Sequence, residues 1–246
     1  MKKFYKIPVA VPSLGKNEKK FVLDCLNTNW ISSQGKYVRT FEQNFKNRFK
    51  TNYALAVSSG TAALQLGILS LGIKNGDEVL VPNLTFAASI NTIIHSGAKP
   101  IIVDINPENW TIDINQVEKN ITKKTKAIMA VHLYGHSADM DKLKKICNKN
   151  KIFLIADCAE SLGATYKRKE KNTLGDVSAF SFFGNKMITT GEGGMILFKK
   201  KSHYEKAKIL RDHGMSKTKK YYHVEVGFNL RMTNIQAAIG VAQLLS

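Results

Sequence analysis

The sequence is poor in cysteine, in long apolar runs and in acidic residues. Its three cysteines, Cys25, Cys147 and Cys158, show no CxxC spacing and leave an odd number, which favours a reducing compartment over a disulfide framework. No apolar run approaches the length of a transmembrane helix. Lysine and proline interrupt the first 15 residues, where a signal peptide needs a continuous apolar region. These absences predict a soluble cytoplasmic protein without a membrane partner.

Acidic residues number 19 against 37 lysines and arginines, which gives a formal net charge of +18. A positive surface favours anionic ligands such as phosphates, nucleotides or nucleic acid. The basic residues lie in short scattered groups, with no zinc spacing and no aromatic-basic RNA motif, so no specific nucleic-acid partner is expected. The length of 246 residues and the hydrophobic content of 43% allow one large domain or two small ones.

The N-terminal part predicts an arm and two helices. Residues 1–12 are expected to be extended, and Asn17 can cap the helix that follows. A second helix is expected where aromatic residues recur every four positions, a stripe that is far more typical of core than of a ligand site. The stripe consists of Tyr37, Phe41, Phe45 and Phe49.

From residue 53 onwards, short apolar strands alternate with helical segments. This alternation predicts βαβ units and therefore an α/β fold with a mostly parallel central sheet flanked by helices. Ligands of such sheets bind beyond the carboxyl ends of the strands. Ser59–Thr61, Phe86, His132 and Asp157–Glu160 follow strands in this way and are expected to converge on one edge.

Several of these residues have a structural interpretation beside the functional one. The turn at Gly60 and Thr61 opens a helix and suits a phosphate, but capping by a neighbouring serine is the better explanation from this turn alone. Phe86 is about equally suited to face a ligand or to pack the start of its helix. His132 and His136 are expected to be core or pocket-lining residues. Asp157 follows five apolar residues, and a carboxylate in that position is usually paired or functional.

The stretch DVSAFSFFGNKMITTGEGG (176–194) contains the strongest candidate for a reactive group. A short strand leads into a polar loop with one lysine, Lys186, and then into a glycine cluster that lets backbone pass close to a ligand. A surface charge is the more common explanation for any lysine in this chain. A pocket of defined shape around Lys186 would instead favour a reactive amine.

Taken together, the motifs resemble the DegT/DnrJ/EryC1/StrS family of sugar aminotransferases, which use pyridoxal phosphate (PLP). The resemblance runs from Ile7 to Ser246 and rests on six segments in one order. They are NWISSQGK, SSGTAAL, PNLTFAAS, DCAESLGA, FSFFGNKMITTGEGG and GFNLRMTNIQAAIG. Within the family, VHLYGHSADMD and GNKMITTGEGGM are most similar to the perosamine-forming branch, which aminates the 4-keto carbon of GDP-4-keto-6-deoxymannose.

The resemblance implies a role for individual residues. Lys186 would be the catalytic residue, covalently linked to PLP and moving the proton during transfer. Asp157 would pair with the pyridinium nitrogen, and Glu160 would reach the 3-hydroxyl. The remaining cofactor contacts would be Phe86 on the ring face, Gly60, Thr61 and Ser181 on the phosphate, and Asn229 on the phosphate of a partner subunit's cofactor. Trp30, Ile31 and Ser32 would line the entrance for the nucleotide sugar.

The implied activity is amino transfer from glutamate to a nucleotide-linked 4-keto-6-deoxy sugar, by a homodimer with shared active sites that serves polysaccharide or glycan biosynthesis. Dehydratases of the family carry histidine in place of the lysine, so Lys186 favours transamination. No metal is expected.

The resemblance also implies a domain organisation. Residues 1–246 would form the N-terminal arm and the PLP-binding large domain of the type I aminotransferase fold. Residues 229–246 would lead toward a smaller C-terminal domain that the chain does not contain. An apolar helix in this last segment needs a surface to pack against. The alternative is therefore a truncated, non-catalytic module that binds PLP and acts through a partner.

Overall fold

A single sheet organises the chain. The structure is a computed structural model that describes residues 8 and 10–245. Within these residues seven strands form the sheet in the order β1-β7-β6-β5-β4-β2-β3. The strands are β1 (Tyr53–Val57), β2 (Glu78–Pro82), β3 (Lys99–Val103), β4 (Thr125–Val131), β5 (Phe153–Asp157), β6 (Val177–Ser181) and β7 (Gly194–Phe198).

The sheet is mostly parallel, as the alternation of strands and helices predicts. The pairs β2–β3, β2–β4, β4–β5 and β5–β6 are parallel, while β7 runs antiparallel to both β6 and β1. Because β7 returns directly after β6, the connecting loop 182–193 stays at the carboxyl end of the parallel strands. That loop contains Lys186.

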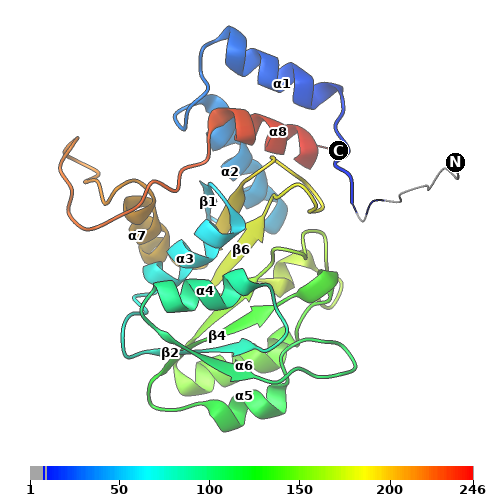
Figure 1. Ribbon diagram of the computed structural model, residues 1–246, viewed down its shortest axis with the longest axis vertical. Coiled ribbons are helices and arrows are strands. Elements are labelled where there is room, and N and C mark those ends of the chain that lie inside the picture. Colours follow the sequence, from blue (N-terminus) through cyan, green and yellow to red (C-terminus); the bar gives the residue numbers. More distant parts are fainter. Residues whose placement is uncertain (1–7, 9, 246) are drawn as a thin grey trace, which may run out of the picture.

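Helices cover both faces of the sheet (Figure 1). One face packs against α1, α2, α5, α6 and α8, and the other packs against α3, α4 and α7. Side chains of β6 alternate accordingly: Phe180 joins the first layer, and Val177 and Ala179 join the second. The helices are α1 (Lys16–Asn27), α2 (Lys36–Phe49), α3 (Gly60–Ser70), α4 (Ala87–His95), α5 (Ile114–Asn120), α6 (Met140–Asn150), α7 (Lys201–Arg211) and α8 (Asn234–Leu244), with short 3-10 turns at Leu133–Gly135 and Glu170–Thr173.

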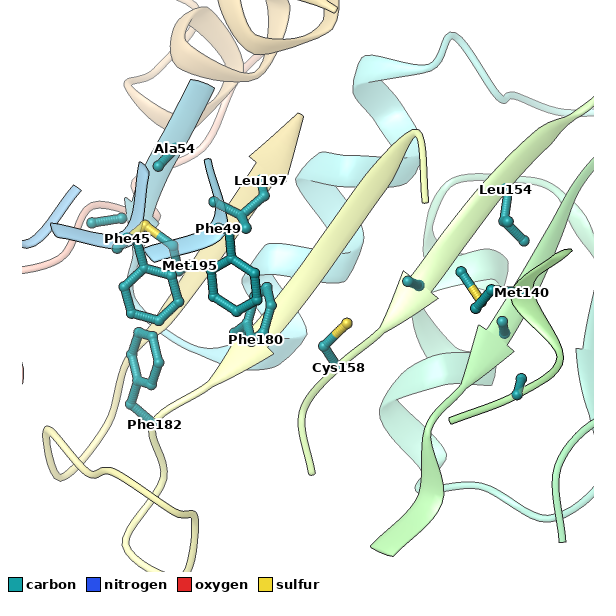
Figure 2. Packing of buried hydrophobic residues seen from close by; sticks show 14 of the residues in the cluster. Phe45, Phe49, Ala54, Met140, Leu154, Cys158, Phe180, Phe182, Met195 and Leu197 are labelled. Carbon is teal, nitrogen blue, oxygen red and sulfur yellow. The ribbon is translucent and has the colours of Figure 1, made fainter. Parts of the chain in front are cut away.

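The aromatic stripe of α2 lies in the core, as predicted. Phe41 and Phe45 are fully buried, and Phe45 contacts Phe180 and Phe182 of the β6 region with ring centroids 5.5 Å apart in each pair (Figure 2). Edge-on contacts of this kind stabilise aromatic pairs beyond the area they bury. The cluster anchors α2 on the strand that leads to Lys186.

The start of α1 differs from the prediction that Asn17 caps it. The helix begins at Lys16 with Gly15 as its N-cap, and the Glu18 carboxylate accepts a hydrogen bond from the Gly15 amide at 2.8 Å. The reciprocal carboxylate makes a side-chain cap unnecessary. Most of the expected extended arm, at residues 1–7 and 9, lies outside the described residues.

The apolar helix α8 is packed against α1 and α2 rather than left without a partner surface (Figure 1). Val241 is buried, and Gly240 lies so close to the ring of Phe41 that a methyl group there would approach it to 2.6 Å. The surface that this apolar helix was expected to need is therefore supplied by α1 and α2.

Asn234, at the start of α8, ties these helices together. Its side-chain oxygen accepts the Tyr37 amide at 2.9 Å, and its side-chain nitrogen donates to the Trp30 carbonyl at 2.6 Å and to Cys25 Sγ at 3.2 Å. We call this group of contacts the Asn234 junction. Gly35 lies against the same amide and has no room for a Cβ, which explains a glycine there.

Across residues 8 and 10–245, none of the helices combines the length and the apolar character that crossing a bilayer requires.

Candidate active site

A cavity of about 350 Å³ lies at the carboxyl ends of β4, β5 and β6, beside the N-termini of α3 and α4. Parallel strands direct their carboxyl ends to one edge, so residues far apart in sequence meet there. Seven of the eight residues expected to bind a cofactor line this cavity. They are Gly60, Thr61, Phe86, Asp157, Glu160, Ser181 and Lys186.

One end of the cavity is formed by the first turn of α3. Ser59 caps the helix by accepting the Ala62 amide at 3.0 Å. Among the described residues, the amides of Gly60 and Thr61 have no hydrogen-bond partner. Free amides and the positive end of the helix dipole attract an anion. The capping interpretation of this turn is therefore confirmed for Ser59, while the anion interpretation, which concerns the amides of Gly60 and Thr61, stays a prediction.

Glycine is required for this end to close. A Cβ on Gly60 would lie 2.6 Å from Cβ of Ser181, and a Cβ on Gly194 would lie 2.4 Å from the carbonyl oxygen of Ser59. The absence of both atoms lets the start of α3 approach the ends of β6 and β7. The Ser181 hydroxyl thereby reaches the same end of the cavity as the free amides.

Lys186 lines the same cavity and is paired with Glu160. Its Nζ is 3.2 Å from Oε1 of Glu160, and its side chain is 18% exposed. The second carboxylate oxygen of Glu160 accepts the Tyr134 amide at 2.9 Å. Lys186 therefore lies in a partly desolvated pocket of defined shape. This environment favours a reactive amine over an ordinary surface charge.

Asp157 is buried at the end of β5. Its Oδ2 accepts the Ser89 hydroxyl at 2.8 Å and its Oδ1 accepts the Ala159 amide at 3.1 Å. Burial raises the pKa of Asp157 above its ordinary value, and the two hydrogen bonds and the charge of Lys186 oppose that rise. A carboxylate in this environment gains from a cationic ligand group.

His132 forms part of the cavity floor and is neutral. Its Nε2 lies 2.8 Å from the Thr173 carbonyl, and its Nδ1 accepts the Ala138 amide at 3.3 Å, so the ring proton is on Nε2. Burial lowers the pKa of His132 to about 4. His132 is thus both core and pocket-lining, as expected. His136 is neither, because its side chain is exposed and does not line the cavity.

Phe86 is the N-cap residue of α4 and is 76% exposed while lining the cavity. A phenylalanine that only packed the start of its helix would be buried. Its exposure argues against simple packing of the helix start and leaves the ring accessible from the cavity, and its role toward a ligand stays a prediction.

Asn229 and the segment 30–32 lie outside this cavity. Asn229 forms an isolated bridge with Asp212, in the stretch that runs along the edge of β1. Trp30 is 55% exposed, and the carbonyls of Trp30, Ile31 and Ser32 accept hydrogen bonds from Asn234. Their expected roles in binding remain predictions.

Sequence reasoning missed four polar residues of the cavity region. Thr85, Asn185 and Glu192 line the cavity, and Ser89 donates a hydrogen bond to Asp157. Thr85 and Ser89 lie four positions apart and so share one face of a helical turn. That spacing was a usable signal, but a serine in a helix carries little information without its partner.

The sheet, the loop lysine, the buried carboxylate and the helix terminus with free amides are arranged as in the large domain of a type I PLP-dependent aminotransferase fold. Solved structures support this assignment. The putative sugar aminotransferase from Streptococcus pneumoniae in its PMP form has a TM-score of 0.92 and 33% identity, covering 98% of this chain and 66% of its own. Helicobacter pylori PseC, an aminotransferase of pseudaminic acid biosynthesis, has a TM-score of 0.91 and 31% identity, with the same coverage.

The chain belongs to the DegT/DnrJ/EryC1/StrS aminotransferase family, whose model matches residues 12–246. It is 50% identical over 238 residues to the GDP-perosamine synthase of Escherichia coli O157:H7 and 47% identical over 238 residues to that of Vibrio cholerae. Each match covers 97% of this chain and 65% of the relative. The resemblance found in the motifs is confirmed, and the chain spans about two thirds of the length of these relatives.

Proposed function

We propose that this chain is the large domain of a PLP-dependent aminotransferase that transfers an amino group to a nucleotide-linked keto sugar. The observation that supports this best is the meeting of Lys186, Asp157 and the free amides of α3 in one cavity. Each group is chemically complementary to a different part of the cofactor. The amine suits the aldehyde, the carboxylate suits the ring nitrogen, and the helix terminus suits the phosphate.

The residues present fit PLP. A dianionic phosphate suits the amides of Gly60 and Thr61 with the Ser181 hydroxyl, and a protonated ring nitrogen suits the buried carboxylate of Asp157. The exposed ring of Phe86 offers a face for stacking. When bound, PLP supplies a carbonyl that accepts amino groups and a ring that stabilises negative charge.

The side chains of the chain itself supply the proton chemistry. Lys186 Nζ would anchor the cofactor and carry the proton to and from the reacting carbon, as a general acid and base. Glu160, paired with Lys186 and held by the Tyr134 amide, keeps the amine in place. Asp157 holds the proton of the ring nitrogen.

For the substrates we propose glutamate as amino donor and the 4-keto carbon of GDP-4-keto-6-deoxymannose as acceptor. The support is the identity of about half of all matched residues with two GDP-perosamine synthases. A net charge of +18 favours an anionic nucleotide diphosphate over a neutral sugar.

The test is an assay with PLP, glutamate and a panel of GDP-, UDP- and dTDP-linked 4-keto sugars, with 2-oxoglutarate and the amino sugar measured by mass spectrometry. We expect turnover with the GDP sugar and a loss of at least about 1,000-fold in Lys186→Ala. The folded state should survive that change, because the ion pair is partly exposed and contributes little. Lys142→Ala serves as the matched lysine control. Turnover that Lys186→Ala leaves intact would refute the assignment.

A second candidate is a non-catalytic PLP-binding module that acts through a partner. It is favoured by the coverage of only 65% of the relatives' length. This candidate expects saturable PLP binding without turnover of any sugar in the panel, so the same assay separates the two.

The homodimer is also a proposal. Asn229 lies outside the cavity of its own chain, which supports a role for it in the site of a second copy. Mixing inactive Lys186→Ala and Asn229→Ala chains would then restore about a quarter of the activity, because random pairing leaves one intact site in half of the dimers. Recovery of no activity on mixing would contradict shared sites. Trp30, Ile31 and Ser32 are proposed to contact the nucleotide sugar on the same basis of resemblance.

A further inference from the structure

A pair of hydroxyl groups at the start of α4 is hydrogen-bonded to Asp157. Ser89 Oγ donates to Oδ2 of Asp157 at 2.8 Å, and the Thr85 and Ser89 hydroxyl oxygens are 2.7 Å apart. The Ala159 amide holds the other carboxylate oxygen at 3.1 Å. Ser89 is fully buried, whereas Thr85 reaches the cavity wall.

The chemistry of the three groups sets the direction of these hydrogen bonds. Ser89 Oγ donates its single hydroxyl proton to Oδ2 of Asp157. Ser89 must then accept from Thr85, which makes Thr85 the first donor of the chain. Hydrogen bonds arranged head to tail strengthen one another, and a bond to a charged acceptor is about twice as strong as a neutral one.

Few other groups assist this carboxylate. Lys186 and Glu160 face it from the cavity with opposite charges, and Cys158 follows it on the same chain. His132 of the neighbouring strand donates its backbone amide to the Asp157 carbonyl and has a neutral ring. Ser89 of α4 and Thr85 just before the helix therefore contribute hydroxyls, and no charged side chain, to a buried acid.

We propose that Thr85 and Ser89 are positioning residues that orient the Asp157 carboxylate and keep it ionised, so that it can hold a cationic ring nitrogen. The inference rests on the proposed function for the identity of the ring, but the hydroxyl pair itself is a property of this chain. Phe86 lies between the two residues, so one turn at the start of α4 presents the stacking ring and orients the carboxylate.

The first test uses thermal unfolding of the full chain without added cofactor, in a cycle of Ser89→Ala and Asp157→Asn. At pH 8 we expect Ser89→Ala to lower the unfolding midpoint by about 5 °C when Asp157 is present, and by about half as much in the Asp157→Asn background. Equal losses in both backgrounds would mean that Ser89 serves only packing, and would overturn the proposal.

The pH dependence has a definite sign. Burial raises the pKa of Asp157, so the stability that this acid contributes is complete at low pH and is lost as the pH rises through its folded pKa. Removing the Ser89 donor raises that pKa further. The loss caused by Ser89→Ala should therefore grow as the pH rises through the folded pKa of Asp157, and a loss that does not change with pH would contradict the inference.

Two further variants separate the hydroxyl from the side-chain volume. Ser89→Thr keeps the donor and should restore most of the midpoint. Ser70→Ala removes a buried hydroxyl that bonds only the Gly67 carbonyl, so its effect should not change with pH. Thr85→Val is expected to reproduce part of the Ser89→Ala effect, and Thr85→Ser to reverse it.

The second test measures the affinity of the chain for PLP itself by its visible absorbance. We expect Ser89→Ala to weaken PLP binding about tenfold, and the pH range over which the absorbance is constant to shift upward. If the chain binds no PLP but Ser89→Ala still lowers the unfolding midpoint more when Asp157 is present, the proposed function is refuted and the positioning role stands. Normal PLP binding in Ser89→Ala, together with equal unfolding losses, would remove the positioning role alone.

Discussion

The cavity and the Asn234 junction both contain polar groups that are enclosed by packed helices and strands. The two regions differ in how many of these groups have a hydrogen-bond partner. Within the junction, the Asn234 side chain uses its oxygen on Tyr37 and its nitrogen on Trp30 and Cys25. In the cavity, the described residues leave the amides of Gly60 and Thr61 without a partner.

This difference separates a structural polar group from a functional one. A buried group that has found its partners within the chain stabilises one arrangement and has no capacity left for a ligand. Polar groups that meet in a cavity without hydrogen-bond partners raise the free energy of the ligand-free chain. A ligand that supplies those partners lowers it again. Here the free amides, the single-partner amine of Lys186 and the exposed ring of Phe86 meet that description.

Asn234→Ala should break the junction and destabilise the fold strongly. It leaves the Tyr37 amide and the Trp30 carbonyl without their partner, which costs on the order of 3 kcal/mol of the free energy of unfolding and lowers the midpoint by about 6–12 °C. Asn47→Ala, which removes only an exposed hydrogen bond with Gln43, is the control and should change the free energy by less than about 0.5 kcal/mol. Equal effects of the two changes would contradict the comparison.

Gly60→Ala should instead damage the cavity while sparing the rest of the fold. The added methyl group meets Ser181 at 2.6 Å and pushes the start of α3 away from β6. An overpacking cost of about 2 kcal/mol at the binding end corresponds to about 30-fold weaker binding of PLP. Gly184→Ala, where a Cβ meets nothing within 4 Å, should leave the affinity within about threefold. Spectroscopic titration with PLP measures both.

His132, which lines the cavity, should make the stability of the chain depend on pH. Because burial lowers its pKa to about 4, the unfolded chain binds a proton below about pH 6.5 while the folded chain does not. Stability is therefore full above that pH and is lost as the pH falls toward 4. His132→Gln should reduce this loss by on the order of 2 kcal/mol, measured by urea unfolding at several pH values. If His132→Gln leaves the loss of stability at acidic pH unchanged, other titratable groups cause that loss.

An exposed ion pair should matter least. Lys142 pairs with Asp139 at 3.1 Å, close to the separation of Lys186 and Glu160, but its side chain is 66% exposed. Lys142→Ala should change the free energy of unfolding by less than about 0.5 kcal/mol and leave turnover unaltered. A larger loss in either measurement would show that charge pairing alone, without enclosure in the cavity, is sufficient to matter in this chain.

Much of the fold and of the cavity could be predicted from local patterns. The alternation of strands and helices indicated the parallel sheet, and the rule for its carboxyl edge grouped Gly60, Phe86 and Asp157. Lys186 joined that group only through the family resemblance. The aromatic stripe of α2 was assigned to the core correctly, because a period of four on one helix face depends on the sequence alone.

One failure is local, and the others concern contacts between segments far apart in the chain. Asn17 looked like a cap, but the carboxylate of Glu18 replaced it. Nothing local in α8 indicates that Asn234 bonds residues about 200 positions away, or that Ser89 bonds Asp157 across 68 positions. Both side chains look ordinary in the sequence, because their importance lies in what they meet after folding.

The sequence by itself determined the family, the order of strands and helices, and which residue types arrive at the carboxyl edge of the sheet. Periodicity and motif spacing are local properties, so no structure is needed to read them. Only the tertiary structure decided which of those residues share a cavity, that Lys186 pairs with Glu160, that a pair of hydroxyls is hydrogen-bonded to Asp157, and that α1 and α2 cover α8. These are properties of distance and burial, and they arise only when packing brings remote segments together.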